Sequence, residues 1–201
     1  MLICKKNLKP LFYIHIPRTG GRYVKNLFEK NEFEVSLYEF DNFFEGKEIP
    51  HLHYPYYNKF TNNEKIPQFT IVRNPIDRFI SILCASSKKD KYNLDIEKIF
   101  YNEESFFNFV NYHIIYTSNR TNWFLPQIYF IGPNCKIWRF EKGLNENFFN
   151  WLKVNYEIDI FFKEVIYQKD YYDLYEKIKL KNNFVNLIKK YYLFDFKILD
   201  Y

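Results

Sequence analysis

Short apolar runs alternate with stretches of helical spacing along this chain. The runs LFYIHI at 11–16 and FTIV at 69–72 are rich in β-branched and aromatic residues, which predicts two buried strands. Apolar residues at helical spacing follow each run and predict helices that begin near Gly21 and at Pro75. Asn74 supports the second start, because its side chain can accept a backbone N–H bond at a helix N-terminus.

The same reasoning extends over the rest of the chain. KIWRFE at 136–141 predicts a third strand, SFFNFVNYHII at 105–115 and NENFFNWLKVN at 145–155 predict helices, and the Tyr-rich C-terminal third is expected to be helical. Residues 31–68 are expected to be irregular. In the helix after Pro75, Arg78 and Ser81 lie off the apolar stripe. Strands that alternate with helices imply a single α/β domain over 1–201, with a short, mostly parallel sheet covered on both faces.

Composition and charge support a folded domain and favour an anionic ligand. The 201 residues are 47% hydrophobic and 22% aromatic, which is enough apolar surface for a core. Lys and Arg number 29 against 24 Asp and Glu, a net charge of +5. That excess suits an anion, but it is too small to indicate a nucleic-acid partner by itself, and we expect none.

Cysteine spacing and the N-terminal stretch bear on the compartment. Cys4, Cys84 and Cys135 are far apart and lack metal-ligand spacing, which favours free thiols in a reducing compartment. No apolar run approaches the ~18 residues of a membrane span. The stretch MLICKKNLKPLFYIHI carries lysines in its middle and no small-residue cleavage site. We therefore expect no signal peptide and a cytoplasmic protein.

Two strand-to-helix turns carry candidate anion-binding chemistry. The first turn, PRTGGR at 17–22, combines a glycine pair with two arginines and a threonine hydroxyl, but no Gly-Lys-Ser/Thr follows. At the second turn Arg73 ends the strand, and Ser81 lies eight residues further along the chain. Ligands of such sheets bind at the carboxyl ends of strands, so two turns predict a ligand with two separated anionic groups. Taken alone, the two-glycine turn is better explained as a plain tight turn between strand and helix. For the second turn, the alternative is an exposed helix start with a solvated arginine.

These segments resemble the PAPS-dependent carbohydrate sulfotransferases. FYIHIPRTGGRYV is similar to their 5′-phosphosulfate loop, typically IPKTGGTS, and FTIVRNPIDRFISIL to their 3′-phosphate motif, typically VRDPxxRxxSxY. Three later segments are similar to the Pro-Gln, Tyr-Glu-x-Leu and closing motifs of the family: NWFLPQIYFIG, IWRFEKGLNENFFNWL and YYLFDFKILDY. With gaps, the likeness runs from Leu11 to Tyr201.

The resemblance implies a P-loop-type three-layer fold and a reaction. A sulfuryl group would pass from 3′-phosphoadenosine 5′-phosphosulfate (PAPS) to a hydroxyl of a carbohydrate or related acceptor, without a metal. It assigns the 5′-phosphosulfate to Pro17, Arg18, Thr19, Gly20, Gly21 and Arg22, and the 3′-phosphate to Arg73 and Ser81. Arg18 stands where the family has a catalytic lysine. It keeps the charge but is no proton donor at neutral pH. Arg22 replaces the usual Thr or Ser.

The resemblance also implies a general base and acceptor contacts. Relatives often place a histidine in a Gly-His-x-Pro segment before the second motif, and HLHYPYY offers His53 there, with His51 as the weaker alternative. Arg120 and Gln127 precede or belong to the Pro-Gln segment and, together with His51, are expected to contact substrate. A solvated arginine and a turn amide are the alternatives.

The remaining polar residues of interest are expected to be structural. These are His15, His113 and Asp195. Two other function classes stay open. A small-molecule or nucleotide kinase would need a Gly-Lys-Ser/Thr and a magnesium-binding aspartate after a strand, and neither is visible. A nucleic-acid-binding protein would interleave lysines with aromatics, for which KKYYLFDFK is the one local candidate.

Overall fold

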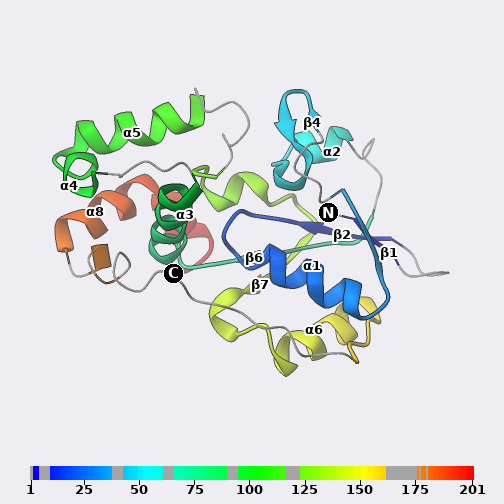
Figure 1. Ribbon diagram of the computed structural model, residues 1–201. Helices are drawn as coiled ribbons and strands as arrows, with labels where there is room; N and C mark the ends of the chain where they lie inside the picture. The colour runs from blue at the N-terminus through cyan, green and yellow to red at the C-terminus, as the bar shows by residue number, and fades with distance from the viewer. Residues whose placement is uncertain are drawn as a thin grey trace. The chain divides into compact units, whose positions relative to one another are not determined.

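The computed structural model describes residues 2–4, 10–37, 43–60, 66–89, 95–115, 123–161, 176, 178–179 and 181–201. The chain forms two compact units, each assembled from two separated stretches of sequence. The first unit comprises Met1–Arg73 with Tyr129–Tyr167, and the second comprises Asn74–Ile128 with Gln168–Tyr201. The sheet belongs to the first unit, and the described part of the second is helical (Figure 1).

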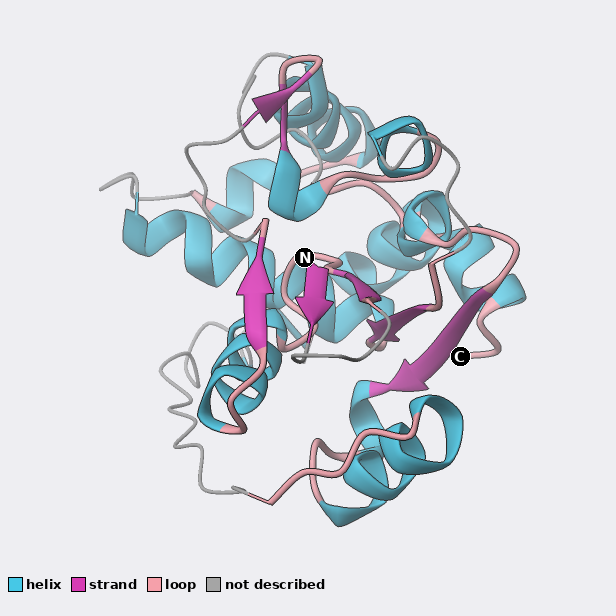
Figure 2. Cartoon of the chain, turned by 90° about the vertical axis from the view of Figure 1, so that its right-hand side faces the viewer, coloured by secondary structure: helices cyan, strands magenta, loops and turns pink. Residues whose placement is uncertain are grey.

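A five-stranded sheet in the order β3-β1-β2-β6-β7 forms the centre of the first unit (Figure 2). β2, β6 and β7 run parallel, so Ile14 lies beside Thr70 and Val72 beside Arg139. The predicted strands at 11–16 and 69–72 are thereby confirmed as interior, neighbouring strands that end at one edge of the sheet. The bounds are β1 (Leu2–Cys4), β2 (Leu11–Ile14), β3 (Glu34–Ser36), β6 (Gln68–Val72) and β7 (Cys135–Arg139).

The other half of the sheet differs from the prediction. β1 pairs antiparallel with both β2 and β3, so the sheet is mixed, with three parallel strands. The stretch 31–68, expected to be irregular, also contains regular structure: β3, a two-stranded ribbon of β4 (Phe43–Phe44) and β5 (Lys47–Glu48), the short helix η1 (Ile49–His51) and α2 (Tyr56–Phe60). Elements of two to five residues give too few repeats for a hydrophobic period to show.

One face of this sheet packs on two helices, α1 (Gly21–Lys30) and α6 (Glu146–Tyr156). Alternate strand residues such as Tyr13 and Ile71 point to this face because side chains alternate along a strand. They meet the apolar faces of the two helices in one buried cluster. On the opposite face, the ring of Phe12 packs against the ring of Tyr57 in α2, with 5.7 Å between the two ring centroids. The predicted helices after β2 and after the third strand are confirmed.

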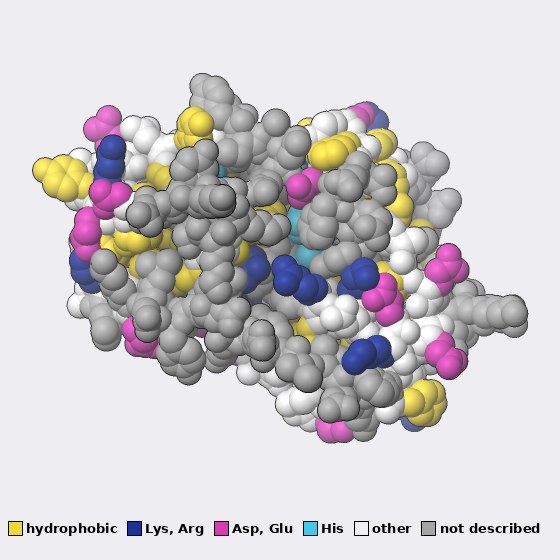
Figure 3. Space-filling model, in the orientation of Figure 1, with side chains coloured by type: hydrophobic (Ala, Val, Ile, Leu, Met, Phe, Trp, Pro, Cys, Tyr) yellow, Lys and Arg dark blue, Asp and Glu magenta, His cyan; other side chains and the backbone are white. Residues whose placement is uncertain are grey.

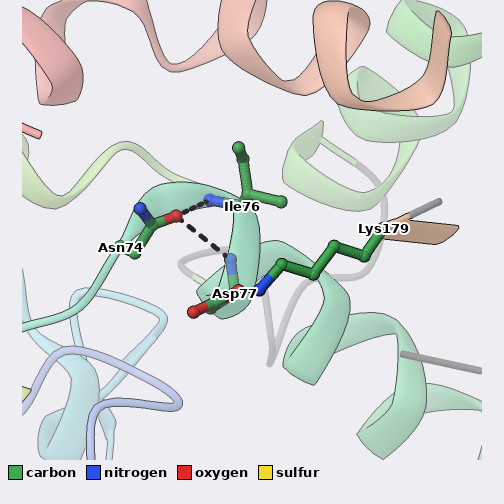
Figure 4. Close-up of polar contacts among 4 residues, drawn as sticks. All are labelled: Asn74, Ile76, Asp77 and Lys179. Atoms are coloured by element: carbon green, nitrogen blue, oxygen red, sulfur yellow. Dashed lines mark hydrogen bonds and ion pairs between the residues drawn. The ribbon is translucent and has the colours of Figure 1, made fainter. Parts of the chain in front are cut away.

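The second unit is a cluster of helices around an aromatic core. Asn74 caps α3 as predicted, since its Oδ1 accepts from the backbone N–H groups of Ile76 at 3.0 Å and Asp77 at 3.4 Å (Figure 4). The Asp77 carboxylate also pairs with Lys179 at 3.5 Å. The bounds are α3 (Pro75–Lys89), α4 (Ile96–Ile99), α5 (Glu103–Ile115), α8 (Asn182–Tyr191) and α9 (Leu193–Ile198).

The burial of Arg78 differs from what its position on the predicted helix indicates. Although it lies off the apolar stripe of α3, it is fully buried. Its guanidinium donates to the main-chain oxygens of Leu125 at 2.9 Å and Trp123 at 2.6 Å, and it stacks on the ring of Tyr192 at 5.9 Å. A buried charge is tolerated when hydrogen-bond acceptors compensate it in this way. Arg78 therefore belongs to the interior of the second unit.

Within the described ranges, no helix combines the length and apolar character needed to cross a bilayer. Cys84 is a buried free thiol and Cys135 a half-buried one. Burial raises the pKa of the Cys135 thiol to about 12, so it stays protonated at neutral pH.

Candidate functional site

The turn between β2 and α1 is built by its own side chains. The Thr19 hydroxyl is buried and donates to the main-chain oxygen of Ile16 at 2.8 Å. Pro17 is buried as well, whereas Arg18 is half-buried with a left-handed φ of 68°. Gly20 follows with φ 97° and occupies the N-cap position of α1. The Thr19 proton is thus used inside the turn, while the Arg18 side chain is half-buried beside it.

Both glycines of this turn lie against other side chains. A Cβ on Gly20 would come within 2.9 Å of Leu144 and 3.2 Å of Phe140. A Cβ on Gly21 would overlap the His15 ring, with Nε2 at 1.9 Å. No side chain caps the N-terminus of α1 in the part of the chain that is described. The first backbone N–H groups of a helix have no partner within it, so this end of α1 suits an anion.

Arg73 links the end of β6 to this turn. Its Nη1 donates to the main-chain oxygen of Arg18 at 3.3 Å, and its guanidinium lies 5.0 Å from the ring centroid of Phe140. The two strand ends therefore bring the half-buried side chains of Arg18 and Arg73 to one edge of the sheet. Arg22, in the first turn of α1, is exposed. Figure 3 shows Lys and Arg side chains beside histidines near the middle of the face in view.

Two buried histidines stand next to the turn. The rings of His15 and His51 are 4.8 Å apart, and His51 Nδ1 lies 2.8 Å from a carboxylate oxygen of Glu48. Burial holds the pKa of His15 well below its usual value, and the charges of His51, Arg18 and Arg22 act in the same direction. His15 is thus the packed residue that the sequence predicted.

His53 lies in the same segment but has a different environment. Its ring packs at 4.7 Å from Tyr56 and 6.0 Å from Phe130. Its Nδ1 is buried and finds no hydrogen-bond partner among the described residues. Burial lowers its pKa, and the charge of Lys47 adds to this effect. A neutral, half-buried imidazole of this kind can accept a proton.

Two further predicted site residues belong to the second unit, and a third is not described. Ser81 is nearly buried on α3 of the second unit. Gln127 has no exposed surface, and its backbone N–H donates to Asp195 at 2.9 Å while its side-chain amide lies 3.4 Å from the same oxygen. The geometry thus gives Gln127 a structural role and no support as a substrate contact, and it confirms Asp195 as an acceptor. Arg120 lies outside the described residues.

Sequence reasoning missed two partners of the site. Glu48 lies three residues before His51, a spacing that could have indicated the pair. The sequence did not distinguish Phe140 from other aromatic residues, because these make up 22% of the chain. Within the described residues, no group of three or more His, Cys, Asp or Glu side chains could hold a metal ion. Among the described residues, the half-buried Arg18 and Arg73 side chains and the N-terminus of α1 could hold an anionic cofactor.

The chain matches no family model, no curated protein and no solved structure.

Proposed function

We propose that this chain transfers a sulfuryl group from PAPS to a hydroxyl of a carbohydrate or related acceptor. The observation that carries the proposal is the contact between Arg73 and the main-chain oxygen of Arg18 at 3.3 Å. It joins the ends of two parallel strands, each of which resembles one of the two nucleotide-binding motifs of the sulfotransferases. A bisphosphorylated nucleotide carries two separate anionic groups, which provides one for each turn.

The β2–α1 turn would hold the 5′-phosphosulfate. Backbone N–H groups at the N-terminus of α1 would bind the phosphate oxygens, with Arg18 beside the bridging oxygen. During transfer, the acceptor oxygen forms a bond to sulfur while the bond from sulfur to the bridging oxygen breaks. Charge then gathers on that bridging oxygen, which becomes part of the departing phosphate. A fixed cation at this position lowers the barrier because it interacts most strongly with the transition state.

The acceptor hydroxyl must lose its proton in the same reaction, and we assign this proton to His53. Its burial lowers its pKa, which keeps the imidazole neutral and able to accept a proton at neutral pH. His51 is less suited, because only 3% of its side chain is exposed and its Nδ1 is already paired with Glu48. Arg73 would bind the 3′-phosphate.

The proposal includes neither a metal nor a nucleic-acid partner, and it places the reaction in the cytoplasm. Arginine cations would neutralise the charge that magnesium neutralises in phosphoryl transfer. The expected free thiols support the compartment.

Thermal unfolding with adenosine 3′,5′-bisphosphate (PAP), the product nucleotide, tests the proposal. A ligand at 100 times its Kd stabilises the folded state by about 2.7 kcal/mol, which shifts the Tm of a chain of this size by roughly 5–10 °C. We expect this shift with PAP and a much smaller one with ATP and Mg²⁺ or with single-stranded DNA. Transfer of label from PAPS to a panel of sugars then tests the activity itself.

The controls separate the function classes. A larger shift with ATP and Mg²⁺ would favour a kinase, and a larger shift with single-stranded DNA would favour nucleic-acid binding. Arg73→Ala should abolish most of the PAP shift. The matched control is Lys153→Ala, an exposed cation of the same unit whose Asp159 partner lies at 2.9 Å, and it should leave the shift unchanged.

A further inference from the structure

We propose that Phe140 is a positioning residue that holds the Arg73 guanidinium at the β2–α1 turn, and that preference for a 3′-phosphorylated nucleotide depends on the aromatic ring at this position. The inference rests on the proposed function, in which Arg73 binds the 3′-phosphate. Its own evidence is a set of contacts that Phe140 makes with both halves of the site.

The sheet register brings Phe140 beside Arg73. β6 and β7 are parallel neighbours, and Val72 is paired with Arg139. The next residue on each strand is Arg73 and Phe140, so these two leave the sheet side by side. The guanidinium carbon of Arg73 lies 5.0 Å from the ring centroid of Phe140, within the range of a cation–π contact.

Phe140 also touches the glycine turn. Its Cε2 lies 3.2 Å from the position of a Cβ on Gly20, so the ring occupies the space that a side chain there would take. The ring is half-buried and, like Leu144, packs against the core that includes Trp138. Phe140 is therefore fixed by the interior of the first unit while one side of it faces Arg73.

The contact with the Phe140 ring matters because the side chain of Arg73 is long and flexible. Ordering a free arginine side chain costs up to ~2 kcal/mol of rotamer entropy, which weakens any ligand that must order it on binding. The stack on Phe140 and the bond to the Arg18 oxygen restrain Arg73 before a ligand arrives. An aliphatic side chain of similar volume would fill the core but would not attract the cation through a ring quadrupole.

Dissociation constants for PAP and for adenosine 5′-monophosphate, which lacks the 3′-phosphate, test the inference. Phe140→Leu should weaken PAP about 5-fold, the equivalent of roughly 1 kcal/mol, and leave the monophosphate within 2-fold. Phe140→Tyr keeps a ring and should restore PAP binding. Phe33→Leu is the matched control, because it removes a ring from the same core where Phe33 packs edge-on against Phe28, and it should change neither constant. Phe140→Met takes the place of the leucine variant if that protein does not fold.

The possible failures are distinguishable. If the unaltered chain does not bind PAP, the proposed function fails and the inference falls with it. If the chain binds PAP and Phe140→Leu binds it equally well, the inference alone is wrong. Equal weakening of both nucleotides would also overturn it, because the ring would then act through the Gly20 turn and not through Arg73.

Discussion

The Nε2 atom of His15 lies 1.9 Å from the point where a Cβ atom on Gly21 would stand. The imidazole thus occupies the side-chain position of the first residue of α1. Gly21 has an ordinary helical backbone, so the close approach of His15, and not a special φ angle, requires glycine here. Gly20 differs, because its φ of 97° is costly for any other residue and a Cβ would also meet Leu144.

Gly21→Ala should therefore destabilise the chain by about 1–3 kcal/mol through overpacking, measured by urea unfolding. The structural reason predicts a rescue: in a His15→Ala background, the space is open and the same change should cost less than ~0.5 kcal/mol. An equal cost in both backgrounds would show that His15 does not fill this position.

Substitutions of Arg18 test its role in the chemical step. Arg18→Asn removes the charge but tolerates the left-handed backbone better than alanine. It should lower turnover by roughly 10²–10³ while PAP binding changes less than 10-fold, because the backbone N–H groups of α1 remain. Arg18→Lys should keep substantial activity. Full turnover in Arg18→Asn would move the catalytic cation elsewhere, with Arg22 as the first residue to change.

His53→Ala should lower turnover by roughly 10²–10⁴ with nearly unchanged PAP affinity, as expected for the loss of a general base. His51→Ala is the comparison. It leaves the nearly buried Glu48 carboxylate without its 2.8 Å partner, so it should cost about 1–3 kcal/mol of stability. Near-normal turnover in His53→Ala would exclude this role for His53 and direct attention to His51 or to a carboxylate such as Glu48. Steady-state kinetics and unfolding curves together separate the two outcomes.

Stability should fall in mild acid because of His15. Burial, the largest cause, keeps the folded pKa of His15 well below 6.5, so between these values the unfolded chain binds more protons than the folded one. Stability then rises with pH through this window and is lost as the pH falls below about 6.5, by at most ~1.4 kcal/mol per pH unit. The lowered pKa of His53 acts in the same direction.

The measurement compares unfolding free energies between pH 5 and pH 7. His15→Gln should show a shallower slope than the unaltered chain, and His113→Gln, from the second unit, serves as the control. An unchanged slope in His15→Gln would mean that His15 is not the group that is kept neutral.

Local signals predicted local structure well. Asn74 and Pro75 predict the start of α3, which begins at Pro75. The Asn74 side chain caps this helix as expected. The runs around Tyr13 and Phe69 are rich in β-branched and aromatic residues, which predicts buried strands. Both residues are buried in the structure. Their parallel pairing followed from the helices between them, since parallel strands need such connections.

Long-range contacts set what the sequence could not predict. Arg78 lies off the apolar stripe, and its burial depends on carbonyl groups 45 and 47 residues away. The stack of Phe140 on Arg73 depends on the register between β6 and β7, which no single segment specifies. The mixed sheet arises from β1 and β3, whose three residues each are too short to give a period. These contacts, the strand register and the strand pairing cannot be predicted from a residue's neighbours in sequence or from its position in the helical repeat.

The interleaved connectivity of the two units has a consequence for synthesis on the ribosome. All residues of the first unit have been translated once Tyr167 is added, whereas the second unit still lacks Gln168–Tyr201. Until then, the backbone N–H groups of Gln127 and Ile128 have no Asp195 carboxylate to donate to, and the Arg78 cation has no Tyr192 ring to stack on. The nascent chain can therefore complete the sheet with its β2–α1 turn first, while the helical unit closes only when the last helices emerge.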